Sequence, residues 1–75
     1  MIISEVKANL DHTLKITFTT GEVGVFDVKP YLSLEAFAEL NNHESFQKIF
    51  NGGYFIEWQC GADLSTDTIE SKLQI

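Results

Sequence analysis

Apolar and polar residues alternate along residues 2–28, and this period of two constrains the fold more than any other feature of the chain. In the clearest run, Leu14, Ile16 and Phe18 alternate with lysine and threonine. A strand with one buried face and one solvated face produces this pattern, which is typical of antiparallel sheets. The sequence therefore predicts three strands joined by two short turns, which together form a β-meander.

The third of these strands, over residues 23–28, differs because it carries apolar residues on both of its sides. We therefore expect both of its faces to be covered. Pro30 then ends the strand pairing, because proline has no N–H group to donate to a neighbouring strand. A single helical turn or a loop is expected over residues 30–32.

Two short amphipathic helices are predicted in the middle of the chain. Ser33 is the expected N-cap of the first, and Asn41 of the second, where Glu44 would complete a capping box. The glycine pair at 52–53 is expected to end the second helix through left-handed backbone. Apolar residues recur at helical spacing in both: Leu34, Phe37 and Ala38 in the first, and Phe46, Ile49 and Phe50 in the second.

Residues 54–58 predict a fourth strand from their aromatic and β-branched content. A last helix is expected to begin after Ser65, with Leu64 and Ile69 forming a hydrophobic staple across its first turn. The order is βββ-α-α-β-α, which predicts one α+β domain over residues 1–75. It would have two layers, an antiparallel β-meander plus one further strand with short helices on one face. The residues expected to be mostly buried are Phe18, Phe26, Phe37, Leu40, Phe46, Ile49, Ile56, Ile69 and Leu73.

The charge balance of the chain argues against nucleic-acid binding. Eleven acidic residues face five lysines, there is no arginine, and the formal net charge is −6. Nucleic-acid binding needs a cationic surface against phosphate, and arginine is the preferred side chain for phosphate and for guanine. We therefore expect no nucleic-acid partner, whereas the field of the protein would attract a basic protein partner.

Nothing in the sequence predicts a membrane-bound or secreted protein. No apolar run is long enough to span a bilayer, and residues 1–5 lack the basic start of a signal peptide. The single cysteine, Cys60, has no partner for a disulfide within the chain. These features together predict a cytoplasmic protein.

The segment around Cys60 holds two candidate chemical sites, each with a simpler structural interpretation. Asp63, Ser65 and Asp67 have the opening spacing of a calcium loop, but the glycine that such a loop needs at its sixth position is replaced by Thr68. A turn followed by an N-cap explains the same residues, so no metal site is expected.

Cys60 would be a nucleophile only if His12 or His43 acted as its base, and the sequence supplies no evident acid to orient either imidazole. A lone cysteine is more often a small buried hydrophobic residue. We therefore expect no catalytic and no cofactor-binding residues, and no enzyme activity.

One face of the predicted meander is a candidate interface, because helices on one side of a sheet leave the other side open. Trp58 is a further candidate, since tryptophan is enriched among the residues that dominate interface energetics. Packing in the core is the alternative for Trp58. We expect association through the open face or a free sheet edge, either with a second copy or with a basic partner. The polar residues expected on that face are Glu5, Lys7, Lys15, Thr17 and Thr19.

Three segments form a pattern that resembles a small bacterial family, known as domain of unknown function twenty-four forty-two. The pattern covers nearly all of the chain from the second strand onward. It departs from the family at Gln59-Cys60, where proline and a polar residue are expected. The segments are Leu14-x-Ile16-x-Phe18-x-x-Gly21-Glu22, then Phe26-Asp27-Val28-x-Pro30-Tyr31-Leu32, and Ile56-x-Trp58-x-x-Gly61-Ala62-Asp63-Leu64-Ser65-x-Asp67-Thr68-Ile69, with Phe37, Leu40 and Phe46 between them.

The resemblance implies a small α/β domain without assigned catalytic residues. Relatives occur alone, fused to a DNA-binding domain, or encoded beside another small protein in an arrangement that resembles a toxin–antitoxin pair. We therefore expect a noncatalytic protein-interaction module, in the role of the acidic, neutralising half of such a pair. The alternative is a nucleic-acid-associated transcriptional regulator or an accessory domain of one.

Overall fold

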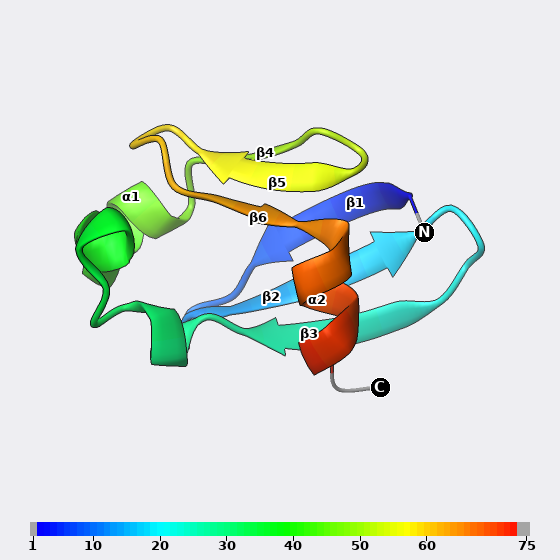
Figure 1. Ribbon diagram of the computed structural model, residues 1–75, viewed down its shortest axis with the longest axis horizontal. Coiled ribbons are helices and arrows are strands. Elements are labelled where there is room, and N and C mark those ends of the chain that lie inside the picture. The colour runs from blue at the N-terminus through cyan, green and yellow to red at the C-terminus, as the bar shows by residue number, and fades with distance from the viewer. Residues whose placement is uncertain (1, 74–75) are drawn as a thin grey trace.

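The computed structural model describes residues 2–73, and within them the chain forms two antiparallel three-stranded sheets and short helices (Figure 1). The predicted α+β class is confirmed, but the strands form two sheets rather than one. The strands are β1 (Ile3–Ala8), β2 (Thr13–Phe18), β3 (Val23–Asp27), β4 (Ile49–Asn51), β5 (Phe55–Trp58) and β6 (Asp63–Ser65). The helices are the 3₁₀ helices η1 (Lys29–Tyr31) and η2 (Glu35–Asn41), and the α-helices α1 (His43–Phe46) and α2 (Thr66–Lys72).

The first sheet is the predicted meander, with the strand order β1-β2-β3. Its inner face is fully buried at Leu14, Ile16 and Phe26. The expectation that β3 is covered on both faces is wrong, because Val23 and Val25 point to the uncovered side and are 43% and 38% exposed. The outer side of this strand is therefore apolar but solvent-exposed.

Leu73, the last residue that the structure describes, covers part of the inner side of β3. Gly24 lies on that side and is buried. A Cβ atom built on Gly24 would come within 2.6 Å of the Leu73 side chain. Because Gly24 has no side chain, Leu73, directly after α2, can pack on β3. Figure 1 shows α2 in the corresponding position beside β3.

The turn between β1 and β2 holds His12 in the left-handed region, at φ 62°. Next to it, the Thr13 hydroxyl donates to Asp11 Oδ1 at 2.6 Å, and this hydrogen bond lowers the pKa of Asp11. The Nε2 atom of His12 lies 3.0 Å from the carbonyl oxygen of Leu40, to which an N–H at that position donates. The His12 ring thereby ties the β1–β2 turn to the end of η2.

The helices in the middle of the chain are shorter than predicted. The first is the 3₁₀ helix η2, which begins after Leu34 rather than after Ser33. The N-cap of α1 is Asn42 and not Asn41, since Asn42 Oδ1 accepts the backbone N–H of Glu44 at 2.9 Å. The Asn41 side chain instead donates to the carbonyls of Leu32 and Ala38, so it closes the turn of η2.

Residues 49–53 correct the prediction of a second helix that ends at the glycine pair. Ile49 pairs with Trp58 in a hairpin, so β4 replaces the last turns of the expected helix. The pair at 52–53 forms the hairpin turn, in which Gly53 has φ 85° and donates its N–H to Asn51 Oδ1 at 2.8 Å. A β-branched residue followed by an aromatic one fits a strand as well as a helix, and pairing with β5 decides the outcome.

The end of the chain combines a confirmed helix with a strand that sequence analysis missed. Ser65 is the N-cap of α2, because its Oγ accepts the Thr68 N–H at 3.3 Å. Leu64 and Ile69, the expected staple, are both buried. Residues 63–65, expected to form only a turn, pair with β5 as the third strand of the second sheet.

The hydrophobic core lies between the two sheets, with η2 and α1 at one end and α2 alongside (Figure 1). The sheets meet where β1 passes β4, since the Ile3 N–H donates to the Gly53 carbonyl at 2.8 Å and Asn51 Nδ2 donates to the Ile3 carbonyl at 2.9 Å. Seven of the nine residues expected in the core are buried: Phe18, Phe26, Phe37, Leu40, Phe46, Ile56 and Ile69. Ile49 and Leu73 are partly buried and pack against the rim of this core, so all nine are at least largely covered, as expected.

Candidate protein-interaction surfaces

The outer face of the first sheet is the surface that the sequence predicted to be open. Register places Lys7 opposite Lys15, which lies opposite Val25 on the next strand. A second row is formed by Glu5, Thr17 and Val23. Of the five polar residues expected on this face, Thr17 is partly buried and the others, Thr19 included, are exposed. The two lysines are directly opposed like charges, an unfavourable arrangement in an antiparallel sheet.

The second sheet has an outer face that sequence analysis did not identify. Phe50 on β4 lies opposite Glu57 on β5, and Glu57 lies opposite Asp63 on β6. Phe55 on β5 lies opposite Ser65, in the adjacent row. Exposure alternates along β5, with Phe55 and Glu57 outward and Ile56 and Trp58 buried. Read with period two, residues 55–58 already carry this signal in the sequence.

Two phenylalanine rings of this face are open to solvent. Phe50 is 56% exposed and Phe55 is 44% exposed. The ring of Phe55 lies over the backbone of Gly52, because a Cβ atom built there would fall 2.4 Å from the ring. Tyr54, in the adjoining hairpin turn, is 67% exposed. We call the set Phe50, Phe55, Glu57 and Asp63 the acidic–aromatic face.

Trp58, the remaining candidate for an interface, belongs to the core. It is 1% exposed, and its Nε1 donates to the carbonyl of Phe46 at 2.9 Å. The ring is stacked against Phe46, with centroids 5.9 Å apart, and is edge-on to Phe37. Because β5 turns this residue inward, Trp58 has no surface to offer a partner in the folded chain.

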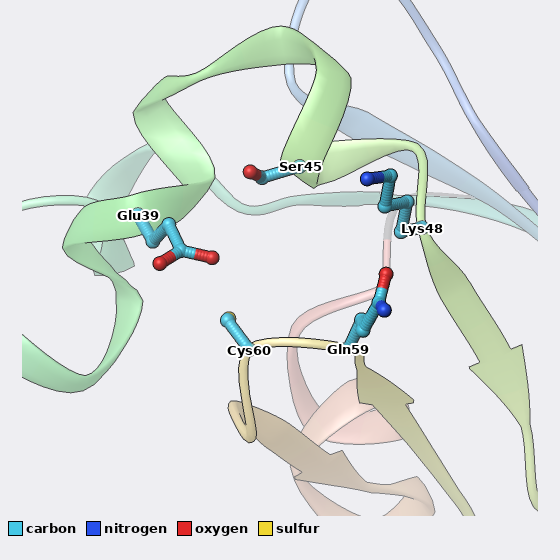
Figure 2. Close-up of a pocket in the computed structure, with 5 residues that line it drawn as sticks. All are labelled: Glu39, Ser45, Lys48, Gln59 and Cys60. Atoms are coloured by element: carbon cyan, nitrogen blue, oxygen red, sulfur yellow. The ribbon is translucent and has the colours of Figure 1, made fainter.

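Cys60 is exposed, which contradicts the expectation of a buried hydrophobic residue. It lies in the turn between β5 and β6, at a surface hollow of about 280 Å³ that is also lined by Glu39, Ser45, Lys48 and Gln59. Figure 2 shows the Cys60 side chain and the Glu39 carboxylate pointing toward the same space. A connecting turn lies at the surface because its backbone polar groups need water, so the thiol lies there too.

Neither histidine lies at this hollow. His12 Nε2 is bound to the Leu40 carbonyl, and its ring packs 4.9 Å from that of Phe46. On α1, His43 Nε2 lies 2.9 Å from Nε2 of Gln47, the C-cap residue of that helix. The structure therefore does not bring an imidazole to Cys60, and the cysteine–histidine arrangement considered from the sequence is not assembled.

The residues with the calcium-like spacing have different structural roles and do not form one site. Asp63 points outward from β6, whereas the Ser65 hydroxyl is occupied as the cap of α2. Within residues 2–73 no group of three or more histidine, cysteine, aspartate or glutamate side chains is placed to hold a metal ion. In the same range, no helix has the length and apolar content to cross a membrane.

Replacing Cys60 with serine is expected to change the free energy of unfolding by less than about 0.5 kcal/mol, as for other surface substitutions. In the native wild-type protein, the thiol should react fully with a chromogenic disulfide reagent without denaturant, because it is exposed. Stability is measured by urea unfolding, and reactivity by the absorbance of the released thiol. A thiol that reacts only after unfolding would show that the turn is closed in solution.

A family model matches nearly the whole chain. The model of the family described as "Protein of unknown function (DUF2442)" matches residues 3–74. The chain belongs to this family. The resemblance noted in the sequence is thus confirmed, and this chain is a small α/β domain. Searches of curated proteins and of solved structures find no significant match.

Proposed function

We propose that this DUF2442 chain is a noncatalytic protein-interaction module. The observation that supports the proposal is that each sheet buries only one of its faces. The other faces expose large apolar side chains, namely Val23 and Val25 on the first sheet and Phe50 and Phe55 on the second. Large apolar side chains exposed together on one open face are typical of sites that bind another protein.

The chemistry of the candidate sites favours binding over catalysis. The hollow at Cys60 lacks an imidazole among its lining residues, and both histidines are hydrogen-bonded elsewhere. A nucleophile of this kind is activated by an adjacent general base, which the lining of this hollow does not supply. The role suggested by the resemblance, the acidic and neutralising half of a two-gene pair in the cytoplasm, agrees with the net charge of −6.

The association itself is tested by sedimentation velocity of the purified protein at micromolar concentration, alone and with the product of the neighbouring gene. We expect either a dimer or a complex with that product. Affinity capture from a lysate of the native host, followed by mass spectrometry, extends the search to other partners. A monomer that ignores the neighbouring product and captures no protein would refute the interaction-module proposal.

The second candidate function, a nucleic-acid-associated regulator, is favoured only by the opposed lysines Lys7 and Lys15. Two lysines beside Glu5 make a small cationic patch on a chain without arginine. We expect no binding to random duplex or single-stranded DNA even at low salt, where counterion release favours binding most. Fluorescence anisotropy at increasing salt measures this, and submicromolar binding that weakens as salt rises would favour the regulator instead.

A further inference from the structure

The acidic–aromatic face combines three properties that point to one kind of ligand. Its residues come from three adjacent strands of one sheet. It exposes the rings of Phe50 and Phe55. It also places two carboxylates, those of Glu57 and Asp63, directly opposite each other on neighbouring strands. Opposed like charges weaken strand pairing, and a cation bound between them would remove that repulsion.

Lysine and arginine side chains complement all of these features. Their charged groups can pair with Glu57 and Asp63, while their position over an aromatic ring adds a cation–π attraction. Arginine in particular forms planar, two-point hydrogen bonds with carboxylates. Lys48 lies at the end of this sheet, where its carbonyl accepts the N–H of Gln59, two residues from Glu57, and its side chain lines the hollow at Cys60.

We propose that the acidic–aromatic face, formed by Phe50, Phe55, Glu57 and Asp63, is the surface through which this chain binds a basic protein partner. The proposal rests on the proposed function and specifies its site and the chemistry of the partner. Lysine or arginine side chains of the partner pair with the two carboxylates, and its apolar side chains cover the two phenylalanine rings. The partner is thereby placed on the second sheet and not on the face of Lys7 and Lys15.

Charge argues against a second copy of the chain as the occupant. A two-fold dimer through this face would bring Glu57 and Asp63 of one copy against the same residues of the other, since such an interface is self-complementary. Four carboxylates would then share a desolvated contact, which costs free energy unless cations intervene. A contact between this face and the Lys7–Lys15 face of another copy avoids the repulsion, and sedimentation of the Lys7→Gln/Lys15→Gln variant without peptide tests it, because that substitution would abolish such self-association.

The test uses ¹⁵N-labelled protein titrated with a short peptide of mixed lysine and leucine, followed by heteronuclear NMR. We expect the amide signals of β4, β5 and β6 on the outer face to shift, with Phe50, Phe55, Glu57 and Asp63 among the most affected. A peptide of the same pattern with glutamate in place of lysine should cause no shift there. Added salt should weaken the binding, because the attraction is largely electrostatic.

Three double variants test which face of the protein binds the lysine–leucine peptide. Removing both carboxylates in Glu57→Gln/Asp63→Asn should weaken binding of the lysine–leucine peptide by about tenfold, as expected for two lost charge pairs at a surface. The matched variant Glu35→Gln/Glu39→Gln removes two exposed carboxylates from η2 and gives the same net charge, and its affinity should change by less than about twofold. Lys7→Gln/Lys15→Gln should not weaken the binding. Circular dichroism confirms that each variant is folded.

Several results would overturn the inference. These are shifts centred on β1, β2 and β3, an equal loss of affinity in the Glu35/Glu39 variant, and self-association through the acidic–aromatic face. Absence of peptide binding to any face would also refute it. None of these results decides the broader proposal, which depends on whether the wild-type chain associates with a cellular protein by sedimentation and affinity capture.

Discussion

Phe46→Ala is expected to destabilise the domain by about 3–5 kcal/mol, the range for phenylalanine truncated in a core. Phe46 is fully buried, stacks on Trp58 at 5.9 Å and contacts the ring of His12 at 4.9 Å. A chain of 75 residues has a total stability of roughly 4–11 kcal/mol at typical values per residue. At the lower end of this range the variant would be largely unfolded, and at the upper end it would stay folded with a clearly lower urea midpoint.

The measurement is urea unfolding followed by far-ultraviolet circular dichroism. Phe50→Ala provides the matched control, because the same side chain is removed four residues away where it is 56% exposed. We expect the control to lose less than about 1 kcal/mol. Equal losses in both variants would mean that the Phe46 ring is not part of the core as described.

Trp58→Phe is expected to cost about 1–3 kcal/mol, because it removes the only side-chain partner that the structure gives to the buried Phe46 carbonyl among residues 2–73. The smaller ring also leaves unfilled volume beside Phe37, which adds to the loss. Circular dichroism is the appropriate signal, since Trp58 is the single tryptophan of the chain and its fluorescence disappears with the substitution.

Tyr54→Phe controls for this change, since it removes a polar group from an aromatic residue that is 67% exposed. Its unfolding free energy should stay within about 0.5 kcal/mol of wild type. A Trp58→Phe variant as stable as wild type would show that the indole N–H contributes nothing net. In that case the hydrogen bond between β5 and α1 would not explain why a tryptophan lies at this position.

The meander and the last helix were predictable because their signals are local. Alternation defines β2 within six residues, and Ser65 with its staple marks the start of α2. The second sheet was not predictable to the same extent. Its strands β4 and β6 have only three residues each, too few for a periodic pattern to separate strand from helix or turn.

The two candidate surfaces differ in the same way, since the one on the first sheet was predictable and the one on the second sheet was not. The polar residues of the first sheet were placed on an open face from alternation alone, and the structure leaves that face uncovered. The acidic–aromatic face was missed because Phe50 was assigned to a helix and Asp63 to a turn. Only the pairing of β5 with both neighbours brings Phe50, Glu57 and Asp63 into one row.

The junction of β1 with the β4–β5 hairpin has a consequence for how the protein is made. The hydrogen bond from Asn51 to Ile3 joins residues 48 positions apart, and the core lies between the two sheets that meet there. A growing chain that ends before residue 49 has the meander but none of the second sheet to cover it. Its inner apolar face would then stay open until the later strands emerge, which is when an unfinished chain is most prone to aggregate. Ribosome-bound chains in which only the residues up to about 45 have left the exit tunnel should therefore be protease-sensitive, whereas chains whose residue 73 has left the tunnel should be protected.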